Sequence, residues 1–125
     1  MNGFLAVFLG AGIGGVLRHA VNIAALKLIG SGFPFGTIFV NIVGSFIMGL
    51  AIEWFALKFD PGQTWRLFLT TGILGGFTTF SAFSLDAALL IERGAYVMAS
   101  VYILISLTAS VGGLFLGLLL IRQFA

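Results

Sequence analysis

Apolar residues run along this chain in four long stretches that short polar segments separate. The stretches are residues 4–29, 37–59, 64–91 and 95–121, and each holds the roughly 20 mostly apolar residues that a membrane-spanning helix needs. Glycine, proline and charged residues mark the turns between them, at residues 30–34, 60–62 and 92–94. The pattern predicts one all-α domain, residues 1–125, built from four transmembrane helices.

The middle of the third stretch concentrates residues that weaken a helix. Gly75 and Gly76 give the backbone freedom, and Thr78, Thr79 and Ser81 offer it competing hydrogen bonds. Irregular backbone at membrane depth is tolerated only where it is buried in protein or faces water. We therefore expect a break in this helix that exposes backbone carbonyl groups to an ion. The alternative is an intact helix in which the small residues serve close packing.

The composition agrees with a membrane protein and excludes several other classes. Of the 125 residues, 60% are hydrophobic and 8% are charged, whereas an average soluble chain has about 25% charged residues. Without cysteine there is no disulfide or thiolate metal site, and one histidine with four scattered acids offers little material for zinc or acid–base chemistry. The net charge is only +2, and the basic residues form no patch suited to nucleic acid. The first residues lack the basic region of a secretory signal, so we expect the first stretch to be retained.

Small and polar residues also recur at helical spacing in the first two stretches. Gly10 and Gly14 allow close helix approach, and Arg18 lies inside an apolar run, where a charge is costly and usually faces a bundle interior or water. Arg18 either attracts an anion toward a pore or hydrogen-bonds to loop carbonyls and fixes the fold. In the second stretch the amide of Asn41 must find a partner. Its two N–H donors suit a small anion, and an interhelical hydrogen bond is the alternative.

Aromatic and hydroxyl side chains complete the candidate site. Phe80 and Phe83 share one face once the helix resumes after the break, and their ring edges are weakly electropositive. Plain core packing is the alternative for both rings. Tyr102, Ser106 and Ser110 follow one face of the fourth stretch, where their O–H groups either pass an anion along or belong to a packing seam.

Charges near the ends of the stretches favour neither orientation in the membrane. With four spans, Lys58, Arg66 and Arg122 lie on one side, and Lys27 and Arg93 lie on the other. Such a chain can insert both ways, and two oppositely inserted copies would form an antiparallel dimer. Its two broken third helices would meet at the midplane, in the manner in which inverted repeats place ion sites in transporters.

These residues resemble the signature of the Fluc (CrcB) fluoride channels. The sequence GGFTTFSAFS, residues 75–84, is similar to the family pattern G-G-x-T-T-F-S-x-F-S, and residues 14–19 and 36–46 resemble its first two spans. The resemblance covers essentially the whole chain. It implies an antiparallel, dual-topology homodimer in the bacterial plasma (inner) membrane, with two fluoride pores and a central structural Na⁺ that is not transported.

The resemblance also implies roles for single residues. The backbone carbonyls of Gly75 and Thr78, from both subunits, would hold the sodium ion. The residues implied for the fluoride pore are the amide of Asn41, the hydroxyl of Thr79, the rings of Phe80 and Phe83, and the polar track of Tyr102, Ser106 and Ser110.

Fluoride conduction requires donors that replace the water around the ion but bind it weakly enough for release. Hydroxyls, an amide and ring edges meet this requirement, and a sodium ion off the pathway would add positive potential without moving. The sequence shows no nucleotide motif and no evident buried carboxylate for proton coupling, and Asp86 reads as interfacial. We therefore expect passive fluoride efflux that lowers cytoplasmic fluoride and its toxicity.

Two other functions remain as alternatives. A small four-span multidrug exporter is also dimeric, but it would need a carboxylate in its first span, and residues 4–29 contain no Asp or Glu. A noncatalytic assembly subunit would explain the packing glycines but not the Thr-Thr-Phe-Ser stretch. An enzyme is not expected, because no nucleophile–base constellation is recognisable.

Overall fold

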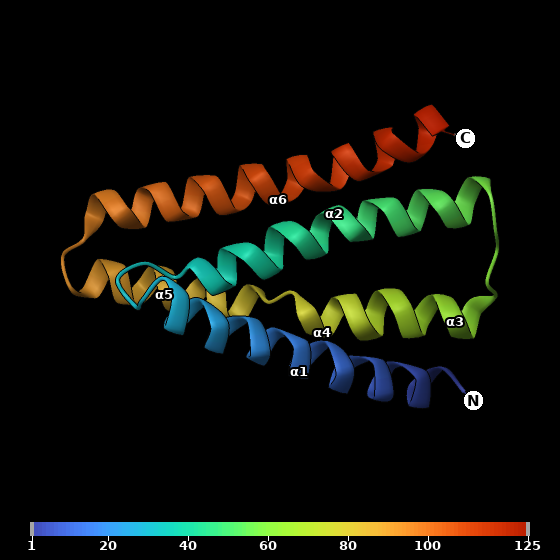
Figure 1. Ribbon diagram of the computed structural model, residues 1–125, viewed down its shortest axis with the longest axis horizontal. Coiled ribbons are helices and arrows are strands. Elements are labelled where there is room, and N and C mark those ends of the chain that lie inside the picture. The colour runs from blue at the N-terminus through green and yellow to red at the C-terminus, as the bar shows by residue number, and fades with distance from the viewer. Residues whose placement is uncertain (1, 125) are drawn as a thin grey trace.

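Four helical spans, each long and apolar enough to cross a membrane, make up the structure (Figure 1). The computed structural model describes residues 2–124, and no strand occurs among them. Three spans are single helices: α1 (Gly3–Leu28), α2 (Phe35–Leu57) and α6 (Tyr96–Phe124). The third span covers Gln63–Glu92. The four predicted spans are confirmed, with bounds within a few residues of those expected from hydropathy.

The third span is the irregular one. Its four helical pieces are α3 (Gln63–Leu67), the π-helix η1 (Phe68–Leu74), α4 (Gly75–Phe77) and α5 (Phe80–Glu92). Between α4 and α5, Thr78 and Thr79 have extended backbone angles, with ψ of 159° and 116°. Figure 1 shows this extended pair as a thin coil near the middle of the span. Gly75 and Gly76, which were expected to loosen the backbone, are themselves helical.

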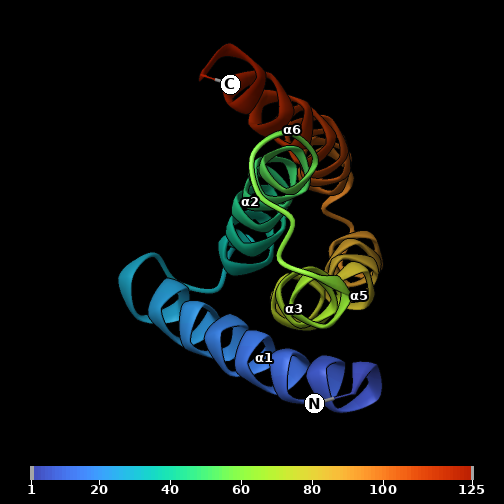
Figure 2. The same cartoon turned by 90° about the vertical axis from the view of Figure 1, so that its right-hand side faces the viewer.

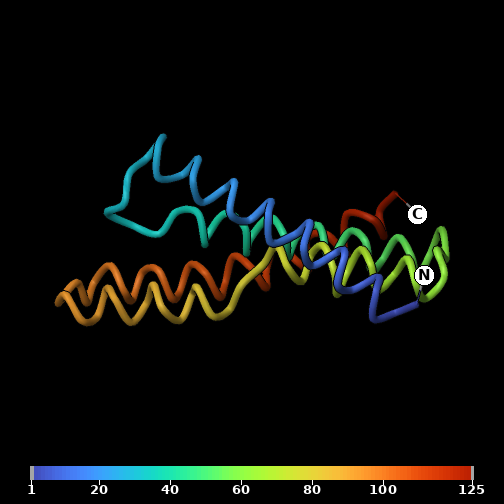
Figure 3. Tube along the Cα trace, turned by 90° about the horizontal axis from the view of Figure 1, so that it is seen from below, coloured from blue at the N-terminus to red at the C-terminus, as the bar shows by residue number. Residues whose placement is uncertain are grey.

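The spans run up and down across the molecule. Both termini and the α2–α3 turn lie at one end, and the α1–α2 and α5–α6 turns lie at the other (Figure 1). Viewed along the bundle in Figure 2, α2 lies between α6 and α1. The α2 helix packs along α6, and α1 packs on η1 and α4. Toward the α1–α2 turn, α1 diverges from α5 and α6 (Figure 3).

Glycines on α1 allow the close approach of this helix to the third span. A Cβ atom added to Gly10 would lie 2.5 Å from the carbonyl oxygen of Phe68, and one added to Gly14 would overlap the carbonyl oxygen of Ile73. From the other side, a Cβ on Gly76 would lie 2.6 Å from a backbone oxygen of α1. The prediction that Gly10 and Gly14 serve close packing is confirmed.

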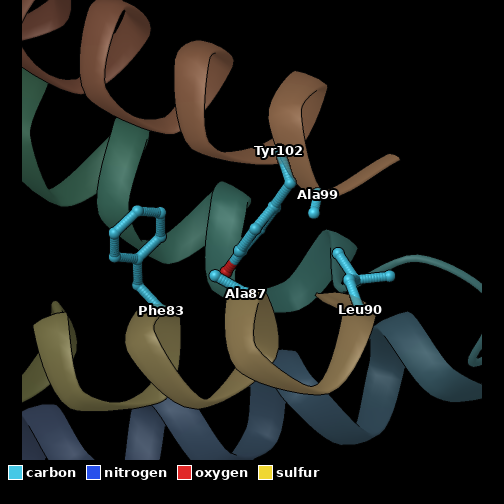
Figure 4. Close-up of a cluster of buried hydrophobic side chains, with 5 residues drawn as sticks. All are labelled: Phe83, Ala87, Leu90, Ala99 and Tyr102. Carbon is cyan, nitrogen blue, oxygen red and sulfur yellow. The ribbon is translucent and has the colours of Figure 1, made fainter. Parts of the chain in front are cut away.

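Buried side chains gather mainly between α5 and α6. The cluster consists of Phe83, Ala87, Leu90, Ala99 and Tyr102, and Tyr102 is fully buried (Figure 4). Large apolar side chains elsewhere point outward on every span. Lipid tails are as apolar as leucine, so this surface is stable in a bilayer. The chain is a multi-pass membrane protein.

Candidate functional site

The extended pair, Thr78 and Thr79, is held by side-chain hydrogen bonds. On α2, Asn41 binds Thr79 twice: its Oδ1 accepts from the Thr79 N–H at 2.7 Å, and its Nδ2 donates to the Thr79 carbonyl at 3.1 Å. The Thr79 hydroxyl accepts from the N–H of Ala82 at 3.1 Å and thereby caps α5. The Thr78 hydroxyl donates to the Leu74 carbonyl at 2.9 Å. Asn41 therefore makes the interhelical contact that was the alternative to a pore role, and it does so with only one of its two N–H groups.

Two backbone carbonyls at this turn, those of Gly75 and Thr78, lack their usual helical donors. In an uninterrupted α-helix the Thr79 N–H would donate to the carbonyl of Gly75, and the Ala82 N–H would donate to that of Thr78. Both amides donate to side-chain oxygens instead. Gly75 lies on the exposed surface of the chain. The carbonyl oxygens of Gly75 and Thr78 are therefore left without the donors that a continuous helix would supply.

Arg18 reaches the same turn from α1. Its Nε donates to the carbonyl of Gly76 at 3.0 Å, and the contact is partly buried. In a continuous helix that carbonyl would accept from the N–H of Phe80, where α5 instead begins. This contact is of the kind expected if Arg18 fixes the fold.

A cavity of about 230 Å³ lies beside the extended pair, between α2, α5 and α6. Six of the residues expected to line a pore line this cavity: Asn41, Thr79, Phe80, Phe83, Ser106 and Ser110. Its lining contains no charged side chain. The hydroxyl oxygens of Ser106 and Ser110 are buried and have no hydrogen-bond partner within residues 2–124. Buried polar groups nearly always have a hydrogen-bond partner. These two hydroxyls have none in the part of the chain that the structure describes, so they are available to a polar ligand.

The two phenylalanines of α5 border the cavity in different ways. Their ring centroids are 5.5 Å apart and the rings are tilted by 49°. Phe83 is buried and lies 5.4 Å from the ring of Tyr102, whereas Phe80 is 74% exposed. Figure 4 shows Phe83 and Tyr102 in one cluster between α5 and α6. The ring of Phe83 is thus held by packing in the core, whereas the ring of Phe80 lies on the surface of the chain.

Tyr102 does not line this cavity, although Ser106 and Ser110, which were predicted to form a polar track with it, do. Its hydroxyl donates to Oδ2 of Asp86 at 3.0 Å, and the hydroxyl of Thr37 donates to the same oxygen at 2.7 Å. Asp86 is half-buried in this contact. Thr37 lies one helical turn before Asn41 on the same face of α2, and this spacing is a sequence signal that could have pointed to the cluster.

A second cavity, of about 360 Å³, is lined by the α1–α2 turn and by neighbouring residues of α1, α2 and α5. Polar and charged members of its lining are Asn22, Ser31, Thr37, Asp86 and Arg93. Arg93 also donates to the carbonyl of Gly32 in that turn, at 2.7 Å. Thr37 and Asp86 thus line this cavity, and Tyr102, which binds Asp86, packs on Phe83 in the lining of the cavity beside the extended pair.

At the opposite end of the molecule, an ion pair joins α2 to α6. The Nε atom of Arg122 lies 2.7 Å from Oε2 of Glu53. The side chain of Glu53 is 12% exposed and that of Arg122 is 54% exposed. Sequence inspection missed this pair, because 69 residues separate its members.

The side chains that most often bind metal ions do not gather in the described part of the chain. Residues 2–124 contain no group of three or more His, Cys, Asp or Glu side chains that could hold one.

The chain matches known proteins over nearly its whole length. The model of the family described as "CrcB-like protein, Camphor Resistance (CrcB)" matches residues 5–118. The chain is 59% identical over 120 residues to the fluoride-specific ion channel FluC of Methylobacterium nodulans, with 96% of each chain covered. It is 57% identical over 122 residues to the protein of the same name from Granulibacter bethesdensis, with 98% of this chain and 96% of the relative covered. For the Rhodopseudomonas palustris protein of that name, the identity is 54% over 119 residues, with 95% and 96% covered.

Proposed function

Because this chain belongs to the CrcB family and is similar to relatives named fluoride-specific ion channels, we propose that it conducts fluoride across the bacterial plasma membrane. Conduction is passive, runs out of the cytoplasm and lowers fluoride toxicity. The observation that carries this function is the cavity beside the extended pair, which is lined by an amide, hydroxyls and aromatic rings but by no charged side chain.

The cavity provides what fluoride needs in order to shed water and still leave. The free O–H groups of Ser106 and Ser110 and the second N–H of Asn41 can donate to the ion, and hydroxyls rotate to follow it. The edges of Phe80 and Phe83 add weakly positive C–H groups. No fixed cation lines the cavity, so the ion is bound weakly enough to move on.

The polar track continues from the cavity toward the α1–α2 turn. Tyr102 packs on Phe83, and its hydroxyl meets Asp86 and Thr37, which also line the second cavity. That cavity forms the vestibule at this end of the pathway. Arg18 acts at the turn of α4, where its contact with a backbone carbonyl supports a structural role.

The working unit is an antiparallel, dual-topology homodimer in which the third span is a helix broken at the extended pair. Three observations support this proposal. Phe80 is 74% exposed although it borders the cavity, so a second copy would complete the wall. Gly75, whose carbonyl lacks its helical donor, is also exposed. Charged residues near the two ends of the bundle are almost balanced, which permits insertion both ways.

A structural sodium ion suits the subunit junction of this dimer. Unwound backbone carbonyls and the C-terminal ends of half-helices are the groups that coordinate Na⁺ in transporters. The carbonyls of Gly75 and Thr78, which lack their helical donors, fit this chemistry. When bound, the ion would link the two copies and supply positive potential next to the pathway, without being transported.

The test of the proposed function is fluoride efflux from liposomes that contain the purified protein. A potassium ionophore balances the charge, and we expect fluoride to leave while chloride stays inside. Replacing sodium with a bulky organic cation should slow the efflux. Efflux that needs a proton gradient, or transport of a drug-like cation in place of fluoride, would favour the exporter instead.

A further inference from the structure

The C-terminal end of α4 creates carbonyl groups without helical partners. A helix leaves its last four C=O groups unpaired unless other donors reach them. Here Leu74 accepts from both the N–H and the hydroxyl of Thr78, at 3.0 and 2.9 Å. The carbonyl of Gly76 accepts from Arg18 at 3.0 Å. The carbonyl of Gly75 loses its donor to Asn41.

We propose that Asn41 and Thr79 are positioning residues for the sodium ion, because they capture the two amides that would otherwise occupy the Gly75 and Thr78 carbonyls. The proposal rests on the sodium site of the proposed function. Oδ1 of Asn41 takes the N–H of Thr79, and Oγ1 of Thr79 takes the N–H of Ala82. Each captured amide is the donor that lies four residues after one of the two proposed sodium ligands.

The placement of the neighbouring glycines agrees with this assignment. Gly76 packs on α1, where a Cβ atom would lie 2.6 Å from the carbonyl oxygen of Ala11, and its own carbonyl is bound by Arg18. Gly75 is exposed, and the nearest atom to a Cβ there is 3.5 Å away. The carbonyl of Gly76 is therefore satisfied within the chain, whereas that of Gly75 has lost its helical donor and belongs to an exposed residue, which suits a cation shared with a second copy.

The same two side chains also line the cavity beside the extended pair. The oxygen of Asn41 holds the backbone, whereas its second N–H is directed to no partner within residues 2–124. Asn41 and Thr79 thus connect the sodium site to the fluoride pathway through single side chains. Loss of the Asn41 oxygen would disturb cation binding as well as conduction.

The matched variants Thr79→Val and Thr79→Ser test the role of the hydroxyl. Both are purified in detergent, and the rise in unfolding temperature on adding NaCl is compared with the rise on adding the chloride of a bulky organic cation. We expect Thr79→Val to weaken the apparent sodium affinity about tenfold, in line with the loss of one hydrogen bond. Thr79→Ser keeps the oxygen and should retain the affinity of the unmodified protein. Thr108→Val, the same change on the exposed face of α6, is the control.

A merely structural role for Thr79 would lower the unfolding temperature equally with and without sodium, and would leave the sodium-dependent rise unchanged. That result would overturn the proposal. If Thr79→Val is not recovered folded, Thr79→Ala removes the same oxygen with less bulk and gives the same comparison. Asn41→Leu, which cannot accept from Thr79, should also lose the sodium-dependent rise, and its retention would contradict the assigned role of Asn41.

The failure of this inference is distinct from failure of the proposed function. If the unmodified protein gains no stability from sodium, the sodium site itself is wrong. If it gains stability and Thr79→Val gains as much, only the positioning role is wrong. Fluoride efflux measured on the same preparations reports on the channel function in either case.

Discussion

Replacing Gly14 with alanine tests the contact between α1 and the third span. A Cβ atom at this position would overlap the carbonyl oxygen of Ile73 and lie 2.8 Å from the backbone N of Phe77. Optimal contacts between non-bonded atoms are about 3.5–4.0 Å. Both obstructing atoms belong to the backbone and cannot rotate away, so the two helices must separate.

The expected cost of Gly14→Ala follows from this overlap. Inserting a methyl group into a filled contact costs about 1–3 kcal/mol, and each 1.4 kcal/mol is roughly a tenfold change in the equilibrium constant. The neighbouring Gly15 is the matched control, because nothing lies within 4 Å of a Cβ there. Gly15→Ala should be neutral or should gain up to about 1 kcal/mol from helix propensity.

The assay is equilibrium unfolding of both variants in detergent micelles, followed by circular dichroism. Gly14→Ala should unfold at a lower denaturant concentration than the unmodified protein, and Gly15→Ala should not. Fluoride efflux should also fall in Gly14→Ala, because the displaced Phe77 is the last residue of α4 before the extended pair. Equal stability of the two variants would refute the close backbone contact on which this reasoning depends.

Three further predictions concern the buried ring beside the cavity, the hydrogen bond between Tyr102 and Asp86, and the ion pair at the opposite end of the molecule. Phe83→Leu removes the buried ring beside the cavity and should reduce fluoride efflux while circular dichroism shows intact helices; unchanged efflux would exclude this ring from the pathway. Tyr102→Phe deletes the hydrogen bond to Asp86 and should lower the free energy of unfolding by about 1 kcal/mol, and no change would mean that this bond contributes nothing. Arg122→Met leaves the Glu53 carboxylate, 12% exposed, without its partner and should lower the unfolding free energy by about 1–3 kcal/mol. Glu53→Gln should cost less, because Arg122 is 54% exposed and can reach water, so the reverse order in thermal denaturation would contradict this reasoning.

The four spans, and the helix faces on which their polar residues lie, could be read from the amino-acid sequence. Apolar length decides whether a helix can cross a bilayer, and this property is local to each segment. Periodicity alone places Ser106 and Ser110 on one face of their helix, and both line the cavity to which Asn41 of α2 also contributes. The dimer, the sodium ion and the residue roles stay predictions.

The backbone conformation of the third span was only partly predictable from the sequence. Glycine and threonine marked the region, but the glycines at 75 and 76 are helical and the extended conformation falls on Thr78 and Thr79. Glycine permits many conformations, so its presence does not say which one is adopted. The nearby π-helix, Phe68–Leu74, left no signal that we recognised in the sequence.

Which polar groups form hydrogen bonds between helices became known only from the three-dimensional arrangement of the spans. Asn41 bonds to Thr79 over 38 residues of sequence, and Thr37 bonds to Asp86 over 49. These partners depend on the crossing and rotation of whole helices, which are set by many packing contacts at once. Periodicity places a side chain on a face of its own helix, but the position of the neighbouring helix determines whether a donor stands opposite an acceptor.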